Sequence, residues 1–138
     1  MVIISRHQST GYAVHRAVEP FRLEDLVESA RANIARLGAY EVLGRPVLFD
    51  YRAVSLTRFD TEDFKQLIAA WVEMGGYRNT PAAMVAGSEL DFGILRMYGA
   101  YREIAGLHEP GGYLITRDYD AAVAWISNVS MELNLSYG

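Results

Sequence analysis

Short apolar runs alternate with longer segments of helical periodicity along the chain, and this alternation constrains the fold more than any other feature. Each long segment repeats its apolar residues at intervals of three and four positions, which places them on one face of a helix. The clearest example runs from Leu23 to Leu37 and is closed by Gly38. Alternation of strand and helix is typical of α/β proteins, in which helices pack on a mostly parallel sheet.

The predicted order of elements is β-β-α-β-α-β-α-β-α. The runs predicted to be strands are residues 2–5, 12–18, 47–51, 82–86 and 113–116. The segments predicted to be helices are residues 23–37, 64–72, 90–104 and 119–133, the second of them ending at Gly75-Gly76. Because the turn Ser9-Thr10-Gly11 is short, the first two strands should form an antiparallel hairpin, whereas strands joined by helices should lie parallel. We therefore expect one α/β domain over residues 1–138, with a mixed, mostly parallel five-stranded sheet, an N-terminal antiparallel hairpin and four helices.

The composition excludes several classes of protein and site. The chain has 138 residues and no cysteine, so it cannot hold a disulfide framework, a thiol nucleophile or a thiolate zinc site. It has 17 acidic and 13 basic residues, and the formal net charge of −4 argues against nucleic-acid binding. No apolar run approaches the roughly 20 residues that cross a bilayer. The N-terminus lacks the pattern of a signal peptide, so we expect a cytoplasmic protein with no integral membrane association.

Polar residues follow three of the predicted strands. These strand ends are Asp50-Tyr51-Arg52, Gly87-Ser88 and Thr116-Arg117-Asp118. Ligands of open parallel sheets bind at the carboxyl ends of the strands, so these residues are candidates for binding. Asp50 could accept hydrogen bonds from a ligand or from backbone N–H groups of the following loop, and the second role is the commoner one for Asp in turns.

Two hydroxyl side chains stand at predicted helix starts. Asp60 and Asp63 have the spacing of a capping box around Thr61, and a phosphate on Thr61 would lie at the positive end of the helix. Ser88 and Asp91 have the same spacing, which explains both residues without a ligand. A nucleophilic Ser88 would need a base, and no motif links any of the three histidines to it. Neither the histidines nor the glycine pairs match a metal or nucleotide motif, so we expect a protein that is not an enzyme and needs no metal or cofactor.

The third predicted helix carries a second face beside its core-facing stripe. Phe92 and Arg96 belong to residue types that are enriched at protein interfaces. Gly93, Gly99 and Ala100 would allow close packing against a neighbouring helix instead, and the sequence leaves both interpretations open. The candidate binding residues, for a partner or a ligand, are Asp50, Arg52, Arg58, Thr61, Ser88, Phe92 and Arg96.

The order of elements and several local phrases resemble the STAS-like fold, the family of the bacterial anti-sigma-factor antagonists. The phrases Phe92-Gly93-Ile94-Leu95-Arg96-Met97-Tyr98 and Asp118-Tyr119-Asp120-Ala121-Ala122-Val123-Ala124-Trp125 look like those of small bacterial proteins of this class. The antagonists have Asp-Ser-Ser-Gly-Leu at the helix start after the third strand, where a partner kinase phosphorylates a serine. This chain has Asp60-Thr61-Glu62-Asp63-Phe64 in that place, so only Asp60 and the hydroxyl of Thr61 match.

The resemblance implies a non-enzymatic regulatory module that binds a protein partner or a second copy of itself. Its binding surface would be the strand-end loops and the third helix, with a homodimer formed through that helix. CRAL-TRIO lipid carriers have the same broad shape and imply an alternative, a carrier or sensor of a small apolar or anionic, lipid-like ligand. In that case Arg52, Arg58 or Arg96 would meet the anionic group.

Overall fold

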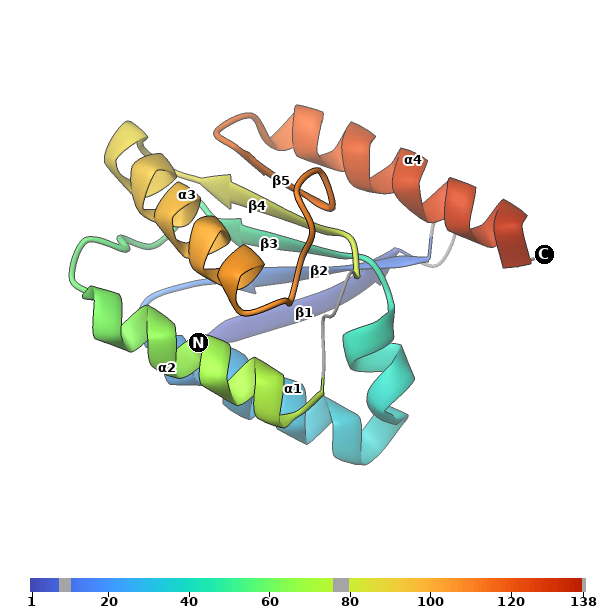
Figure 1. Cartoon of the computed structure of the whole chain (residues 1–138), viewed down its shortest axis with the longest axis horizontal. Coiled ribbons are helices and arrows are strands. Elements are labelled where there is room, and N and C mark those ends of the chain that lie inside the picture. Colours follow the sequence, from blue (N-terminus) through green and yellow to red (C-terminus); the bar gives the residue numbers. More distant parts are fainter. Residues whose placement is uncertain (8–10, 76–79, 138) are drawn as a thin grey trace.

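A five-stranded sheet forms the centre of the protein in the computed structural model, which describes residues 1–7, 11–75 and 80–137 (Figure 1). The strands are β1 (Val2–His7), β2 (Tyr12–Ala17), β3 (Val47–Tyr51), β4 (Ala82–Ala86) and β5 (Tyr113–Thr116), and they lie in that order across the sheet. The helices are α1 (Leu23–Leu37), α2 (Thr61–Glu73), α3 (Glu89–Ile104) and α4 (Tyr119–Tyr137), with a short π-helix η1 (Tyr40–Gly44). The α/β class, the mixed sheet and the order of the main elements are those that the sequence predicts.

The pairing of the strands confirms the predicted hairpin and parallel sheet. β1 pairs antiparallel with β2, and every later pair is parallel. Each crossover helix leads to the next strand in the same direction across the sheet. Because right-handed crossovers that advance in one direction place their helices on one face, α1, α2 and α3 cover the same side. Figure 1 shows α4 alone on the opposite side.

Two apolar cores result from this layering. The larger core lies beneath α1, α2 and α3 and includes Phe49, Trp71 and Met84, while the smaller one lies beneath α4 and includes Leu48 and Ile126. Residues of β3 and β4 alternate between the two cores, so both strands are buried on both faces. This double burial explains why these strands read as continuous apolar runs rather than as alternating ones.

The boundaries differ from the predicted ones in a few places. β1 extends to His7 and β2 stops at Ala17, whereas α2 begins at Thr61 and α4 continues to Tyr137. The segment η1 was not predicted. Of the predicted turns, Ser9 and Thr10 lie outside the described residues, as does Gly76, while Gly75 has the positive φ of 69° expected after a helix end.

Candidate functional site

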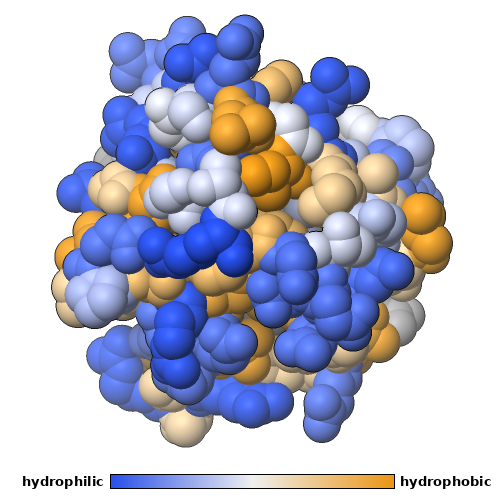
Figure 2. All heavy atoms as spheres, turned by 90° about the vertical axis from the view of Figure 1, so that its left-hand side faces the viewer, coloured by the Kyte–Doolittle hydropathy of each residue, from blue (hydrophilic) through white to orange (hydrophobic). Residues whose placement is uncertain are grey.

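The carboxyl ends of β3, β4 and β5 lie together at one end of the molecule, as parallel pairing requires. The loop between β3 and α2 and the N-termini of α2, α3 and α4 surround them (Figure 1). Figure 2 shows this end of the molecule, where hydrophilic residues dominate and apolar ones form small patches. This polar end contains most of the residues that the sequence marks as candidates.

Asp50 is the buried centre of this end, with a relative exposure of 2%. Its two carboxylate oxygens accept hydrogen bonds from Nε and Nη2 of Arg52, each at 3.0 Å, and Oδ1 also accepts from the backbone N–H of Arg52 at 3.1 Å. Burial raises the pKa of Asp50, but the hydrogen bonds and charge of Arg52 outweigh it and hold the pKa below its ordinary value. The expected bond to the loop backbone is therefore present, with a bidentate ion pair added to it.

Arg16 approaches the same carboxylate from β2. It lies opposite Asp50 in the register of the sheet, and its Nε is 3.7 Å from Oδ2 of Asp50. This contact was not predicted, because the register of two strands separated by a helix cannot be derived from local spacing. The guanidinium of Arg52 in turn lies 4.0 Å from the centre of the Tyr119 ring, which joins β3 to the start of α4.

An open hollow of about 350 Å³ lies beside this ion pair. It is lined by Arg52, Ala86, Gly87, Arg117 and Asp118. Two guanidinium groups, the carboxylate of Asp118 and the backbone at the end of β4 border the hollow, and the guanidinium groups are able to bind an anionic group. Arg117 and Gly87 were part of the strand ends noted in the sequence but were not among the candidate binding residues.

The close approach of the ends of β3 and β4 requires a glycine at position 87. A Cβ atom at this position would lie 2.7 Å from the carbonyl oxygen of Arg52, and backbone cannot move aside as a side chain can. We expect Gly87→Ala to lower the free energy of unfolding by about 2 kcal/mol, because the strand ends must separate. Gly93→Ala is the matched control, since that position is open and alanine stabilises a helix by about 0.5–1 kcal/mol. Urea denaturation of both variants measures the difference, and equal stabilities would contradict this account.

Arg58 and Thr61 lie in the same region but have separate contacts. Arg58 forms a bidentate ion pair with Glu19 at 2.9 and 3.0 Å and donates to the carbonyl oxygen of Phe21, so it ties the loop before α2 to the segment before α1. Thr61 is exposed at the start of α2, with Oγ1 4.0 Å from the sulfur of Met97. Among the described residues, no hydrogen bond or ion pair connects either side chain to the Asp50–Arg52 pair.

The two predicted capping boxes have different outcomes. At α2 the box is confirmed, because Asp60 and Asp63 accept each other's backbone N–H at 2.9 Å. At α3 Ser88 accepts from the backbone N–H of Asp91 at 3.1 Å, but the carboxylate of Asp91 does not return the bond. It is buried and accepts instead from the backbone N–H of Leu56 at 3.2 Å, so the expected reciprocal box at Ser88 is wrong. Ser88 is accounted for by its role as a helix cap.

Phe92 and Arg96 lie on the outer side of α3, next to β5. The guanidinium of Arg96 lies 5.9 Å from the centre of the Phe92 ring, and both border a hollow of about 320 Å³ together with Ala100, Tyr113 and Ile115. The small residues of this helix have divided roles. Gly99 is buried against Tyr113, where a Cβ would come within 2.8 Å of the ring, whereas Gly93 and Ala100 are exposed.

A second polar cluster is buried near the other ends of the strands. Arg102 donates from Nε to Nδ1 of His108 at 3.1 Å and from Nη1 to the hydroxyl of Tyr98 at 2.9 Å. Nε2 of His108 lies 2.6 Å from the carbonyl oxygen of Thr80, and Nε1 of Trp71 donates to the same tyrosine hydroxyl at 3.1 Å. Burial, together with the charge of Arg102, lowers the pKa of His108 to about 4. The sequence analysis did not find this cluster.

The chain matches no protein-family model, no curated protein and no solved structure. Within the described residues, no group of three or more His, Asp and Glu side chains could hold a metal ion. Likewise, none of the helices over the described ranges is long and apolar enough to cross a membrane.

Proposed function

We propose that the protein is a non-enzymatic interaction module of the STAS-like type that binds a second copy of itself through α3 and the adjoining edge strand β5. The observation that carries this proposal is the outer surface of α3, where Phe92 and Arg96 border a hollow on the open side of β5. Because β5 is the last strand of the sheet, one row of its backbone groups pairs with no strand in the described part of the chain.

Exposed apolar residues also lie at both ends of α3. Leu90 is 67% exposed and Ile104 is 82% exposed. Gly93 and Ala100 are exposed and small, so no large side chain projects from these positions and another backbone can approach closely. A symmetric dimer would bring two such surfaces together, with aromatic and arginine side chains at its centre, where binding energy is commonly concentrated.

The strand-end loops suit a docking role in this proposal. Arg52 and Arg58 are both held by carboxylates of the chain itself, so the loops keep their shape without a ligand. One observation favours a second candidate function, the binding of a small anionic ligand. The hollow beside Arg52 is also bordered by Arg117, whose side chain makes no hydrogen bond or ion pair with the residues that the structure describes.

Reversing the charge of Arg96 tests the dimer. We expect native mass spectrometry and light scattering to show a dimer for the unchanged protein, and Arg96→Glu to weaken dimerisation at least about tenfold, because glutamate loses the contact of the Arg96 guanidinium with the Phe92 ring and buries a carboxylate at the interface. Arg36→Glu, at the exposed end of α1, is the matched control and should leave the dimer intact. A monomer that carries a stoichiometric anionic ligand would refute the dimer and support the second function.

A further inference from the structure

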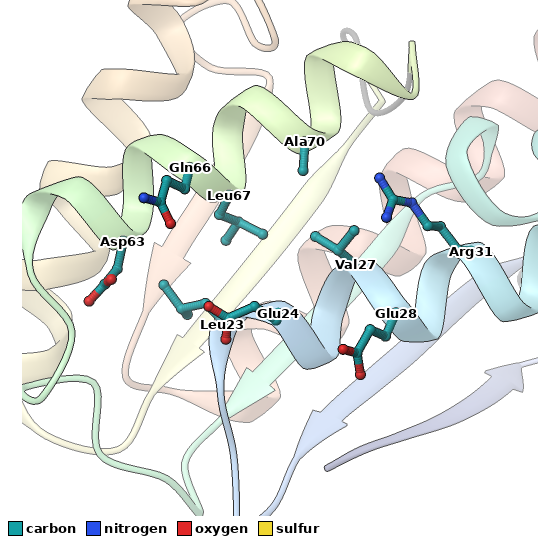
Figure 3. A pocket seen from close by; sticks show the side chains of 9 residues that line it. All are labelled: Leu23, Glu24, Val27, Glu28, Arg31, Asp63, Gln66, Leu67 and Ala70. Carbon is teal, nitrogen blue, oxygen red and sulfur yellow. The ribbon is translucent and has the colours of Figure 1, made fainter.

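A groove between α1 and α2 combines an apolar floor with charged margins. Its volume is about 240 Å³, and it lies on the helical layer away from the hollow at α3 and β5. The residues that line it are Leu23, Glu24, Val27, Glu28, Arg31, Asp63, Gln66, Leu67 and Ala70. Figure 3 shows that they come from facing stripes of the two helices. On each helix these residues are three or four positions apart and so lie on one face. The groove forms where these faces of the two parallel helices pack side by side.

The floor of the groove is apolar and well packed. Val27 and Leu67 point toward each other from the two helices, and Ala70 is small enough to keep the far end open (Figure 3). Leu23 and Leu67 are each only 4% exposed, so packed side chains form the floor of the groove. An apolar side chain of a partner could therefore rest on it and lose its contact with water.

The margins of the groove have an uneven charge distribution. Three carboxylates, those of Glu24, Glu28 and Asp63, face a single guanidinium, that of Arg31. Figure 3 shows Glu24 and Asp63 at the same end of the groove and Arg31 toward the other. The groove thus has an acidic end and one basic position, and a complementary partner would carry the opposite arrangement.

Several of these polar groups have no hydrogen-bonding partner among the residues that the structure describes. In the part of the chain that the structure describes, Glu24, Arg31 and Gln66 form no hydrogen bond or ion pair. Glu28 has only a long contact of 3.5 Å with the exposed Arg22. Asp63 accepts a backbone N–H within the cap of α2 through Oδ2, and its Oδ1 accepts no hydrogen bond from the described residues. The margins can therefore pair with a partner without breaking contacts that the fold needs.

We propose that this groove binds a basic amphipathic segment of a protein partner. The segment places apolar side chains on Val27 and Leu67 and a lysine or arginine between Glu24 and Asp63. A hydrogen-bond acceptor of the segment meets Arg31. From Glu24 to Arg31 the groove is about 10 Å long at the helical rise, so the segment is about two helical turns. This surface is separate from the one in the proposed function, so a regulator could engage the protein while α3 and β5 are occupied.

Selection from a random peptide library on the immobilised protein, residues 1–138, tests the proposal. We expect the enriched peptides to be basic and to contain at least two apolar residues. Fluorescence anisotropy then measures their affinity for the unchanged protein and for Glu24→Lys, in which binding should fall at least about tenfold. Glu24 is exposed and forms no ion pair, so this variant should fold. Glu73→Lys, the same charge change at the exposed end of α2, is the control and should bind within about twofold of the unchanged protein.

The outcomes separate this proposal from its alternatives. Neutral or acidic enriched peptides would overturn it, as would equal binding to the two lysine variants. Loss of peptide binding in Arg96→Glu, with Glu24→Lys unaffected, would assign the peptides to α3 and also overturn it. A dimer that Glu24→Lys dissociates would show that a second copy occupies the groove. Retained peptide binding in a monomeric Arg96→Glu would support the groove independently of the proposed dimer.

Discussion

Lowering the pH from about 7 to about 4 is expected to reduce the free energy of unfolding by about 3 kcal/mol through His108 alone. His108 is 3% exposed, and its two ring nitrogens contact Arg102 and Thr80. Because the guanidinium can only donate, Nδ1 must accept, and the single ring proton sits on Nε2 and is donated to the carbonyl oxygen of Thr80. Protonation of Nδ1 would place two donors against each other beside a buried cation.

The direction of the effect follows from the pKa of His108 in the two states. The folded pKa of about 4 lies below the ordinary value of 6.5, so between these values the unfolded chain binds more protons. The contribution of His108 is therefore complete above about pH 6.5 and is lost as the pH falls toward 4. Urea denaturation at a series of pH values measures this loss.

His108→Gln provides the comparison. A glutamine amide offers an acceptor oxygen for Arg102 and an NH2 donor for the carbonyl of Thr80, but it does not titrate. Below about pH 6.5 the stability of the unchanged protein should fall more steeply than that of the variant, while losses from carboxylates are common to both. Parallel curves for the two proteins over this range would show that His108 does not remain neutral in the fold.

The cluster around His108 shows what sequence patterns cannot supply. Arg102 belongs to α3, His108 follows that helix, and Thr80 precedes β4. The hydrogen bonds among them depend on how the end of α3 packs against the segments that precede β4 and β5. The spacing of residues along the chain does not predict this packing. Tyr98, in contrast, follows the general behaviour of tyrosine in a core: it is 4% exposed, and its hydroxyl oxygen accepts hydrogen bonds from two donors.

Features that depend on short spacing or on burial were predictable. The cap of α2 follows from Asp60 and Asp63 alone, because both bonds close within one turn. The parallel sheet follows from the apolar runs, since only strands covered on both faces tolerate so few polar residues. At α3 the same spacing predicted a reciprocal cap, but the buried carboxylate of Asp91 instead serves the backbone of Leu56, which is distant in sequence. A tertiary contact there replaces the local one.

Five of the candidate residues lie near one another in the structure, but their contacts were not predicted. Asp50, Arg52, Arg58, Thr61 and Ser88 all lie at the carboxyl ends of the strands or at the helix starts beside them, because the order of elements determines which ends meet. The pairing of Asp50 with both Arg52 and Arg16 needed the register of β2 against β3. Whether these side chains or those of α3 bind a partner depends on surfaces that local periodicity does not describe.

Removing Arg52 while leaving Asp50 in place is expected to lower the free energy of unfolding by about 2 kcal/mol at neutral pH. In Arg52→Met the buried carboxylate of Asp50 loses its bidentate partner and keeps the backbone N–H of residue 52 and the distant Arg16. The loss is below that for a fully buried pair because the side chain of Arg52 is itself 43% exposed and is partly stabilised by water. Denaturation of the purified variant measures the loss.

Substituting Asp50 instead of Arg52 tests the same ion pair from its other side. In Asp50→Asn the exposed Arg52 can be hydrated again, so we expect a smaller loss, and Asp50→Asn with Arg52→Met together should cost less than the sum of the two. The loss of free energy of unfolding in Arg52→Met should also shrink as the pH falls below the ordinary pKa of Asp50. In the variant, the carboxyl group no longer pairs with Arg52 and becomes neutral in this range. Additive losses that do not change with pH would mean that Arg52 contributes mainly through its packing on Tyr119, and that the buried charge of Asp50 is stabilised by its surroundings in another way.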